Sequence, residues 1–219
     1  MRLLKVQNLF RSTNGLEKKE LNSLDVYQSE SFLLREFFWL RLNFLVRLIS
    51  WTRPNFENVL DFGGGSGVML PTLSRYFSEV HLIDRDTTEA SKVVEECSLK
   101  NTYLTEVDVV NHNYPEKYFY VIVAADVLEH FQDLNLPINK IRSWLNDDGL
   151  LYTSLPTENL TYRMLRLIFR KKKPLDHYHS AAEVELALVR HGFKRIASLN
   201  HPIGVPIFSL FRISAWRKY

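Results

Sequence analysis

The feature that most limits the fold of this chain is an alternation of β-rich runs and helical patterns that begins at Phe56. The β-rich runs lie at about 58–61, 80–84, 103–107, 120–124 and 150–154. Helix-length segments such as 67–77 and 87–98 separate them. Strands that alternate with helices are typical of a parallel sheet covered on both faces. We therefore predict an α/β fold with a doubly wound, mostly parallel sheet, whose far edge is formed by final strands at about 193–199 and 207–216.

The connections around the fifth strand carry their own signals. Asn146–Gly149 predicts a turn before that strand, because Asn, Asp and Gly are typical turn residues. Two helices are expected after it, at about 160–170 and 181–190. Gly192 suits the position just beyond the end of the second helix.

The length of 219 residues suits one domain with additions rather than two domains. We expect an N-terminal helical cap over residues 1–55 and a main domain over 56–219, with a basic helical insertion at about 157–180. The single cysteine, Cys97, excludes a disulfide framework and a Cys-rich zinc site, and suits a reducing compartment.

The most apolar stretch, Ser31–Trp51, is long enough to span a bilayer, but it also holds Arg35, Glu36, Arg41 and Arg47. An arginine at the centre of a membrane span costs about 2.5–3.5 kcal/mol on insertion scales. Most polar residues gather on one narrow face of the helical wheel, and Arg41 is the exception on its leucine-rich and aromatic remainder. This pattern favours a buried or lid helix, with contact to a membrane surface as the alternative.

The N-terminus lacks the apolar run and cleavage site of a signal peptide, so a cytoplasmic location is expected, with membrane association as the alternative. The net charge of +3 hides a contrast, since residues 1–159 carry −6 and residues 160–219 carry +9. The basic residues concentrate in 160–173, where they alternate with apolar ones. A basic amphipathic helix suits an anionic acceptor or a bilayer surface, whereas a solvated charged face is the simpler alternative.

The most informative short motif follows the first predicted strand. Asp61 ends the strand, and Gly63, Gly65 and Gly67 alternate into the next helix. Glycines allow a sharp turn and a close backbone approach to a ligand, and a helix N-terminus offers free N–H donors. The dinucleotide fingerprint G-x-G-x-x-G fits badly, because its third glycine falls on Val68. A carboxylate before the first glycine instead suits a ligand with cationic and N–H groups.

This D-x-G-x-G-x-G sequence resembles motif I of the class I S-adenosylmethionine (SAM)-dependent methyltransferases. Tyr120–Phe131 looks like the family's motif at the fourth strand, and Leu145–Leu151 looks like the segment before the fifth strand. The resemblance implies a Rossmann-like seven-stranded sheet with an antiparallel C-terminal strand, and SAM as cofactor. It also implies that Asp84 holds the ribose hydroxyls and that Asp108 contacts the adenine. The cofactor-binding residues expected in full are Asp61, Gly63, Gly65, Gly67, Asp84, Arg85, Asp108, Val109 and Ala125.

A second motif, D-x-x-E-H, consists of Asp126, Glu129 and His130. The i, i+3, i+4 spacing predicts that the three side chains share one helical face. The motif resembles the E-x-x-E-H metal-binding motif of the ubiquinone-biosynthesis O-methyltransferases, with Asp in place of the first Glu. A structural role in ordering this helix is the first expectation. His130 as a general base is a second possibility, and a metal site is a weak alternative to our expectation of no metal.

A third group is His177 and His179, which flank Tyr178 in the segment where the resembling family places its substrate pocket. Either histidine is a candidate for a catalytic base or for a phosphate contact, so the catalytic candidates are His130, His177 and His179. The competing explanation is a helix-entry turn, because Ser180 and Glu183 match a capping box.

Taken together, the motifs predict a SAM-dependent methyltransferase that O-methylates a small-molecule, lipid-linked or glycan acceptor, anionic in character. DNA is not expected as the acceptor. The (Asp/Asn)-Pro-Pro-aromatic motif of amino-methylating DNA enzymes is absent at Ala125–Leu128. Methylation of a pyrimidine at C5 needs a cysteine nucleophile, and Cys97 is expected in the helix after the second strand, far from the site. A non-catalytic SAM-binding regulatory subunit and an RNA methyltransferase stay open as alternatives. The sequence does not indicate an oligomeric state.

Overall fold

The computed structural model describes residues 1–4, 32–157, 178–201 and 209–219. In chain order the elements are α2 (Phe32–Thr52), β1 (Asn58–Phe62), α3 (Leu70–Tyr76), β2 (Glu79–Asp84), α4 (Thr88–Glu96), β3 (Thr102–Glu106), η1 (Val109–Asn111), β4 (Phe119–Ala125), η2 (Leu128–His130), α5 (Asn135–Trp144), β5 (Leu145–Pro156), α7 (Ala181–Arg190), β6 (Phe193–His201) and β7 (Phe211–Lys218).

The strands form one seven-stranded sheet in the order β3-β2-β1-β4-β5-β7-β6. β1 to β5 pair in parallel, whereas β7 runs antiparallel to both of its neighbours. The order reverses between β1 and β4, which is the switch point where open α/β sheets bind ligands at the carboxyl ends of their strands. The predicted Rossmann-like α/β fold, mostly parallel with an antiparallel C-terminal strand, is confirmed.

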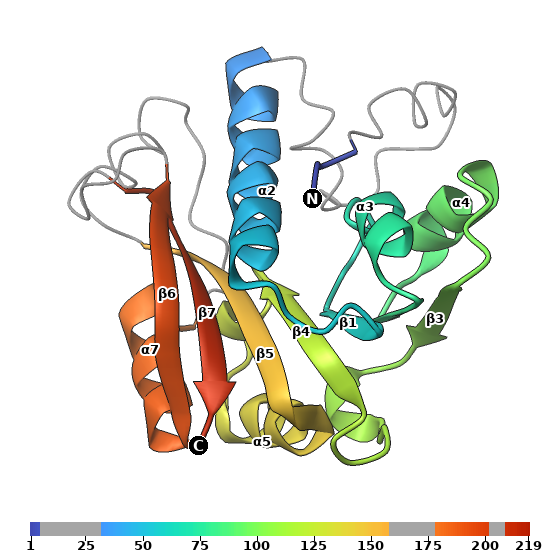
Figure 1. Cartoon of the computed structure of the whole chain (residues 1–219). Coiled ribbons are helices and arrows are strands. Elements are labelled where there is room, and N and C mark those ends of the chain that lie inside the picture. The colour runs from blue at the N-terminus through green and yellow to red at the C-terminus, as the bar shows by residue number, and fades with distance from the viewer. Residues whose placement is uncertain (5–31, 158–177, 202–208) are drawn as a thin grey trace.

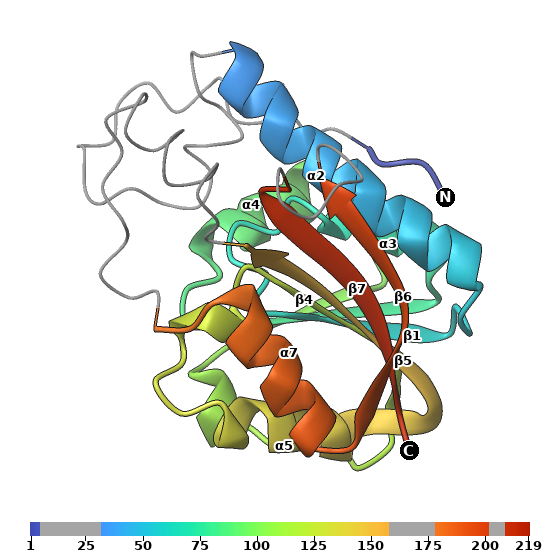
Figure 2. The same cartoon turned by 90° about the vertical axis from the view of Figure 1, so that its left-hand side faces the viewer.

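Helices cover both faces of the sheet, with α2, α3 and α4 on one side and α5 and α7 on the other (Figures 1 and 2). Each face of the sheet buries its own hydrophobic cluster, because alternate side chains of each strand point to opposite faces. All five residues of β1 are buried, as expected for a central parallel strand that is covered on both sides. Hydrophobic burial from both faces therefore holds the switch point rigid.

The helix predicted in the apolar N-terminal stretch is α2. It packs on β5, β6 and β7 and buries Trp39, Leu42 and Leu45 in the first cluster. Its other side leaves Leu40 and Trp51 exposed. Among the described residues, no helix is long and apolar enough to cross a membrane. The basic stretch 160–173, including the predicted helix at 160–170, lies outside the described residues.

The turn predicted at Asn146–Gly149 is wrong, because these residues belong to β5. Phe119 of β4 lies opposite Leu145, but Val121 already lies opposite Leu150. The extra residues of β5 therefore form a bulge, which takes up the Asn-Asp-Asp-Gly sequence without ending the strand.

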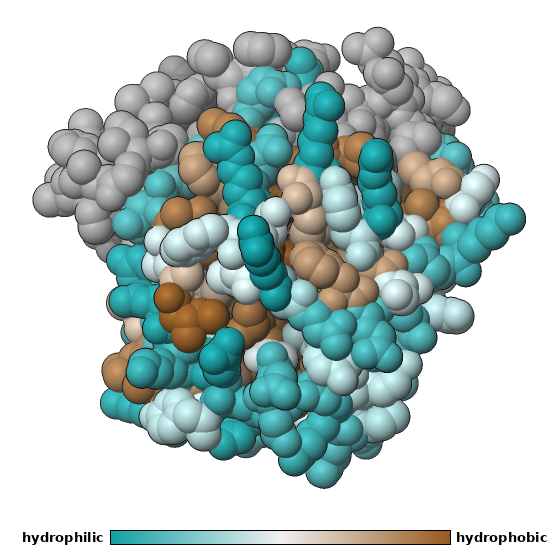
Figure 3. Space-filling model, in the orientation of Figure 1, coloured by the Kyte–Doolittle hydropathy of each residue, from teal (hydrophilic) through white to brown (hydrophobic). Residues whose placement is uncertain are grey.

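The helix at the C-terminal side agrees with its sequence signals. α7 begins and ends at the predicted residues, and Ser180 and Glu183 form the predicted capping box. Gly192 follows with a φ of +78°, the left-handed conformation that ends many helices. The next strand, β6, is the sheet edge and exposes Lys194, Arg195 and Ile196. The face of the molecule in Figure 3 is mainly hydrophilic with scattered apolar residues, and charged side chains on an edge strand oppose pairing with other chains.

Candidate functional site

The glycine loop after β1 lies against the end of β4. Gly63, Gly65 and Gly67 all have φ values in the left-handed region, at +66°, +49° and +71°. A Cβ atom added to Gly63 would clash with Cγ2 of Val127. Glycine is therefore required at this position, both for its backbone conformation and for the approach of the loop to the segment after β4.

Asp84, the last residue of β2, reaches across to the same loop. Its Oδ2 accepts a hydrogen bond from the backbone N–H of Gly65 at 2.8 Å, and its Oδ1 accepts one from the N–H of Asp86 at 3.2 Å. The carboxylate thus lies beside the glycines, at the carboxyl end of the strand next to β1. The position agrees with the ribose-binding role that the motif implies, and that role stays a prediction.

Asp61 lies beneath the loop, with only 3% of its surface exposed. A Cβ atom added to Gly64 would lie 2.7 Å from its Oδ2, so the loop passes directly over the carboxyl group. Burial, reinforced by the nearby negative charge of Asp84, raises the pKa of Asp61 to about 7. A buried carboxylate of this kind gains most from a ligand that brings positive charge or N–H donors.

Asp108 and Arg85 meet beyond the end of β3. Asp108 caps η1 by accepting a hydrogen bond from the N–H of Val110 at 3.2 Å. Arg85 Nη2 donates to Asp108 Oδ2 at 2.8 Å. Val109 is buried in the second hydrophobic cluster, which fixes the short helical turn behind the carboxylate. The structure therefore brings Arg85 and Asp108 together on the same rim as Asp84.

The D-x-x-E-H motif does not lie on one helical face, so that expectation is wrong. Asp126 has a φ of +53°, and η2 covers only Leu128–His130. A left-handed residue followed by a tight 3₁₀ turn directs the side chains differently from an α-helix, because the residue period and the chain direction both change. In the part of the chain that the structure describes, no group of three His, Cys, Asp or Glu side chains could hold a metal ion.

Ala125 and Asp126 form the rim of the site at the end of β4. Ala125 lies opposite Ser154 of β5, and the N–H of Asp126 donates to the carbonyl oxygen of Ser154 at 2.9 Å. The carboxylate of Asp126 forms an ion pair with Arg41 of α2. Arg41 was absent from the sequence-based candidates, although its place on the apolar part of the helical wheel was a signal of a buried partner.

The structure describes two of the three candidate histidines, His130 and His179. His130 lies in η2, directly after the buried Glu129. The Nε2 atom of His179 lies within hydrogen-bond distance of the carbonyl oxygen of Gln132, at 3.2 Å. His177 lies outside the described residues. No catalytic role is tested for any of the three, and each stays a prediction.

The chain is pinned to the rim on both sides of residues 158–177. On one side, Thr157 donates its N–H to Leu210 and its hydroxyl to the carbonyl oxygen of Ser209. On the other, the N–H groups of Tyr178 and His179 both lie within hydrogen-bond distance of the Glu129 carbonyl oxygen, at 2.9 and 3.4 Å. The stretch between these anchors therefore leaves and returns next to the carboxyl ends of β4 and β5.

Comparison with known proteins gives a family match over most of the chain. A family model described as a methyltransferase domain matches residues 35–198. The (S)-coclaurine N-methyltransferase of Thalictrum flavum subsp. glaucum is 28% identical over 101 residues, which are 44% of this chain and 28% of that protein. The (S)-tetrahydroprotoberberine N-methyltransferase of Eschscholzia californica is 24% identical over 100 residues, or 44% of this chain and 29% of that protein. The chain thus spans under a third of the length of these relatives.

Solved structures share the fold at lower identity. The N-methyltransferase NodS from Bradyrhizobium japonicum WM9 superposes with a TM-score of 0.64 at 18% identity, covering 84% of this chain and 97% of that one. Its complex with S-adenosyl-l-homocysteine also gives 0.64, at 15% identity, with 87% and 89% covered. A SAM-dependent methyltransferase from Clostridium acetobutylicum gives 0.65 at 14% identity, with 80% and 89% covered.

Proposed function

We propose, from the premise that the chain belongs to the methyltransferase domain family, that it transfers the methyl group of SAM to a nitrogen atom of a small-molecule acceptor. The observation that carries the proposal is the glycine loop, flanked by the carboxylates of Asp61, Asp84 and Asp108 at the switch point of the sheet.

SAM is the cofactor, and the residues present fit it. Asp61 is a buried carboxylate whose pKa is raised, so it favours a cationic group with N–H donors. Asp84 offers acceptor oxygens beside the loop, and the three left-handed glycines let the backbone come close to a ligand. When bound, SAM supplies an electrophilic methyl group on a sulfonium.

The chain itself would mainly align the reactants and exclude water. Methyl transfer is an in-line displacement, so its rate depends on holding the acceptor atom close to the methyl group. The rim made by Ala125, Asp126 and Ser154 lies across from the glycine loop and is the acceptor side of the site. A neutral amine already carries the lone pair that attacks, so it needs less help from a general base than a hydroxyl does.

Two observations support nitrogen rather than oxygen as the acceptor atom. The relatives with sequence similarity are named as N-methyltransferases, and so is NodS. The carboxylate of Asp126 lies at the acceptor rim, where it can accept an N–H hydrogen bond.

O-methylation of a small-molecule, lipid-linked or glycan acceptor is the second candidate function. It is favoured by the basic sequence at 160–173, which suits an anionic acceptor or a membrane surface. The two anchors at Thr157 and Tyr178 lie at the rim on either side of this stretch. A cytoplasmic location with association to a membrane surface belongs to the same proposal.

The test uses SAM with a tritiated methyl group and a panel of matched acceptors. Each amine is paired with the alcohol of the same carbon skeleton, and anionic lipid and glycan extracts form separate arms. We expect label in amines and little in the paired alcohols. Label confined to alcohols, lipids or glycans would establish the second candidate, and binding of SAM without transfer to any arm would favour a regulatory protein.

Cofactor binding is measured on the same preparation by calorimetry. Asp84→Ala removes charge-assisted hydrogen bonds and should weaken SAM binding by about a hundredfold. Unchanged affinity would contradict the assignment of Asp84 to the ribose.

A further inference from the structure

We propose that Asp126 and Ser154, with Arg41 as the positioning residue, form a subsite that receives an uncharged N–H group of the acceptor. This inference rests on the proposed function, because it names residues for the acceptor side of the same site. It also specifies the protonation state that the subsite selects, which the family match does not address.

The position of the subsite follows from the sheet. Asp126 directly follows β4 and Ser154 lies near the end of β5, and a backbone hydrogen bond of 2.9 Å joins the two residues. Val127, the next residue, fills the space next to Gly63 that a Cβ atom would need. Asp126 therefore lies one residue away from the contact with the glycine loop, and Ser154 is joined to it from β5.

Two polar atoms here lack the partner that buried groups normally have. Oδ1 of Asp126 and Oγ of Ser154 are buried, and within the described residues neither has a hydrogen-bond partner. Ser154 is fully buried, whereas the side chain of Asp126 keeps 28% of its surface exposed. Most buried polar groups in proteins are hydrogen-bonded, so a carboxylate oxygen and a hydroxyl without partners, on two residues joined by a backbone hydrogen bond, indicate a place for a ligand donor.

Asp126 is also held in an uncommon conformation. Its φ of +53° lies in the left-handed region, which non-glycine residues adopt rarely and Asn or Asp most readily. Such conformations persist where the surroundings impose them, and they are frequent at ligand sites. Here the backbone bond to Ser154 and the ion pair with Arg41 together impose the conformation.

Arg41 neutralises the negative charge of the Asp126 carboxylate in the subsite. Its residue surface is 2% exposed, and its guanidinium lies 4.9 Å from the ring centre of Phe211 and 5.4 Å from that of Phe38. The rings on α2 and β7 fix the guanidinium against the Asp126 carboxylate. Because Arg41 already neutralises this carboxylate, a cationic ligand gains little binding energy from it. A neutral ligand can still donate an N–H hydrogen bond to it at no electrostatic cost.

The balance matters because only the neutral amine can be methylated. The lone pair of the nitrogen forms the new N–C bond while the C–S bond breaks, and its electron pair stays on sulfur. The nitrogen becomes positive, and the methylated product leaves the subsite as an ammonium ion, which exchanges its N–H proton with water. A lone carboxylate would instead stabilise the unreactive ammonium before transfer.

The binding test uses the protein loaded with S-adenosylhomocysteine and two probes, benzylamine and benzyltrimethylammonium, in a buffer alkaline enough to keep benzylamine uncharged. The second probe keeps the ring but carries a fixed positive charge and has no N–H group. We expect benzylamine to bind more tightly, and Ser154→Ala to weaken it about fivefold, the loss of one hydrogen bond. Ser198→Ala is the matched control, since it removes a hydroxyl from β6 of the same sheet, where its Oγ meets Ser214.

The proposal is overturned if benzylamine fails to bind, if both probes bind equally, or if Ser154→Ala and Ser198→Ala bind benzylamine alike. Calorimetry with SAM separates this failure from failure of the proposed function. Normal SAM binding and amine methylation without an effect of Ser154→Ala would refute the subsite alone. Benzylamine binding that depends on Ser154, without any methyl transfer, would refute the proposed function and leave the subsite standing.

The role of Arg41 is tested by its charge. Asp126→Asn keeps the shape and tolerates the left-handed φ, and it should weaken benzylamine binding about tenfold. Arg41→Met leaves the Asp126 carboxylate unpaired, so benzyltrimethylammonium should now bind at least fivefold more tightly than to the wild type. The double variant Arg41→Met/Asp126→Asn removes both charges, which guards against misfolding from one buried unpaired charge. It should bind the cation no better than the wild type, and a gain in the double variant would contradict the charge-balance argument.

Discussion

The two halves of the sheet hold their buried and rim carboxylates in different ways. In the cofactor half, around β1 to β3, carboxylates accept hydrogen bonds from backbone N–H groups, as Asp84 does from Gly65 and Asp108 from Val110. Asp108 also forms an ion pair there with the exposed side chain of Arg85. In the acceptor half, around β4 to β7, carboxylates pair with the side chains of arginines from other helices and strands. Asp126 pairs with Arg41 of α2 in this way.

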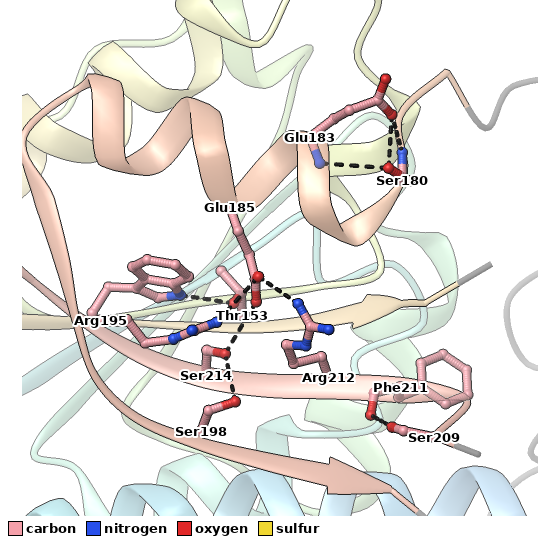
Figure 4. A network of polar contacts seen from close by, with 11 residues as sticks. Thr153, Ser180, Glu183, Glu185, Arg195, Ser198, Ser209, Phe211, Arg212 and Ser214 are labelled. Atoms are coloured by element: carbon pink, nitrogen blue, oxygen red, sulfur yellow. Dashed lines mark hydrogen bonds and ion pairs between the residues drawn. The ribbon is translucent and has the colours of Figure 1, made fainter. Parts of the chain in front are cut away.

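Glu185 of α7 gives the second example in the acceptor half. Its Oε2 accepts from Arg212 at 2.6 Å and from Arg195 at 3.1 Å, and Ser214 and Ser198 continue the network (Figure 4). The carboxylates of the cofactor half are thus held mainly by backbone N–H groups, whereas those of the acceptor half are held by arginine side chains. Negative charge stays available at Asp61 and Asp84 and is neutralised at Asp126 and Glu185.

The largest loss of stability is expected for a substitution at Gly63, where the glycine loop of the cofactor half contacts Val127 of the acceptor half. Gly63→Ala places a Cβ atom against Val127 and keeps a φ of +66°, so the free energy of unfolding should fall by about 3 kcal/mol. SAM binding should be lost with it. Denaturant unfolding and calorimetry measure the two quantities. Combining Gly63→Ala with Val127→Ala should recover part of the stability, and no recovery would show that the backbone conformation alone decides.

A second variant should affect the acceptor half alone. Glu185→Gln leaves two arginines without their carboxylate, and the free energy of unfolding should fall by about 2 kcal/mol in denaturant titrations. SAM affinity should stay within about twofold, because no bond of the cofactor half changes. The control is Glu183→Gln on the same helix, since glutamine preserves a capping box. Equal losses in the two variants would remove the distinction between the halves.

The pH dependence of SAM binding probes the available charge in the cofactor half. Because the pKa of Asp61 is raised to about 7, affinity for a cationic ligand should rise with pH up to about 7, by up to tenfold per unit. The ligand-free protein should respond in the opposite sense. The pKa of Asp61 is higher in the folded than in the unfolded state, so its contribution to stability falls as pH rises from about 4 to about 7.

Calorimetric titrations across this range give the affinity, with Asp61→Asn as the control. The variant should bind SAM more weakly, and its affinity should lack the rise between pH 5 and 7. A variant with the same pH profile as the wild type would show that Asp61 is not the group that titrates.

The smallest effect is expected for a surface pair far from both sites. Lys117 and Asp147 form an ion pair of 2.6 Å, but both side chains are more than half exposed. Water and salt screen such pairs, so Lys117→Ala should leave the thermal midpoint and SAM affinity unchanged within error. A clear loss of stability would mean that exposed ion pairs matter here as much as the Glu185 network.

The cofactor half could be predicted from sequence because its determinants are local. A strand, an acid and three alternating glycines specify the loop within a few residues, and the capping box of Ser180 and Glu183 is equally local. The acceptor half resisted prediction for the opposite reason. The pairing of Arg41 with Asp126 joins residues from α2 and from the end of β4, and neither sequence neighbourhood specifies it.

The same limit explains the two corrections. The D-x-x-E-H motif was assigned to an α-helix by its spacing, but the left-handed φ of Asp126 depends on contacts with Ser154 and Arg41. Asn146–Gly149 is a reasonable local prediction of a turn, yet β4 pairs with Leu145 before it and with Leu150 after it, so β5 continues through it as a bulge. In both places tertiary contacts override a local pattern.

The hydrogen bonds at Thr157 and Tyr178 fix the two points at which residues 158–177 join the described structure. Because both ends are fixed by hydrogen bonds to the rim, a segment of different length or sequence can replace residues 158–177 while β5, α7 and the glycine loop keep their places. Chimeras that graft this stretch from other methyltransferases should therefore keep the described sheet and the glycine loop intact.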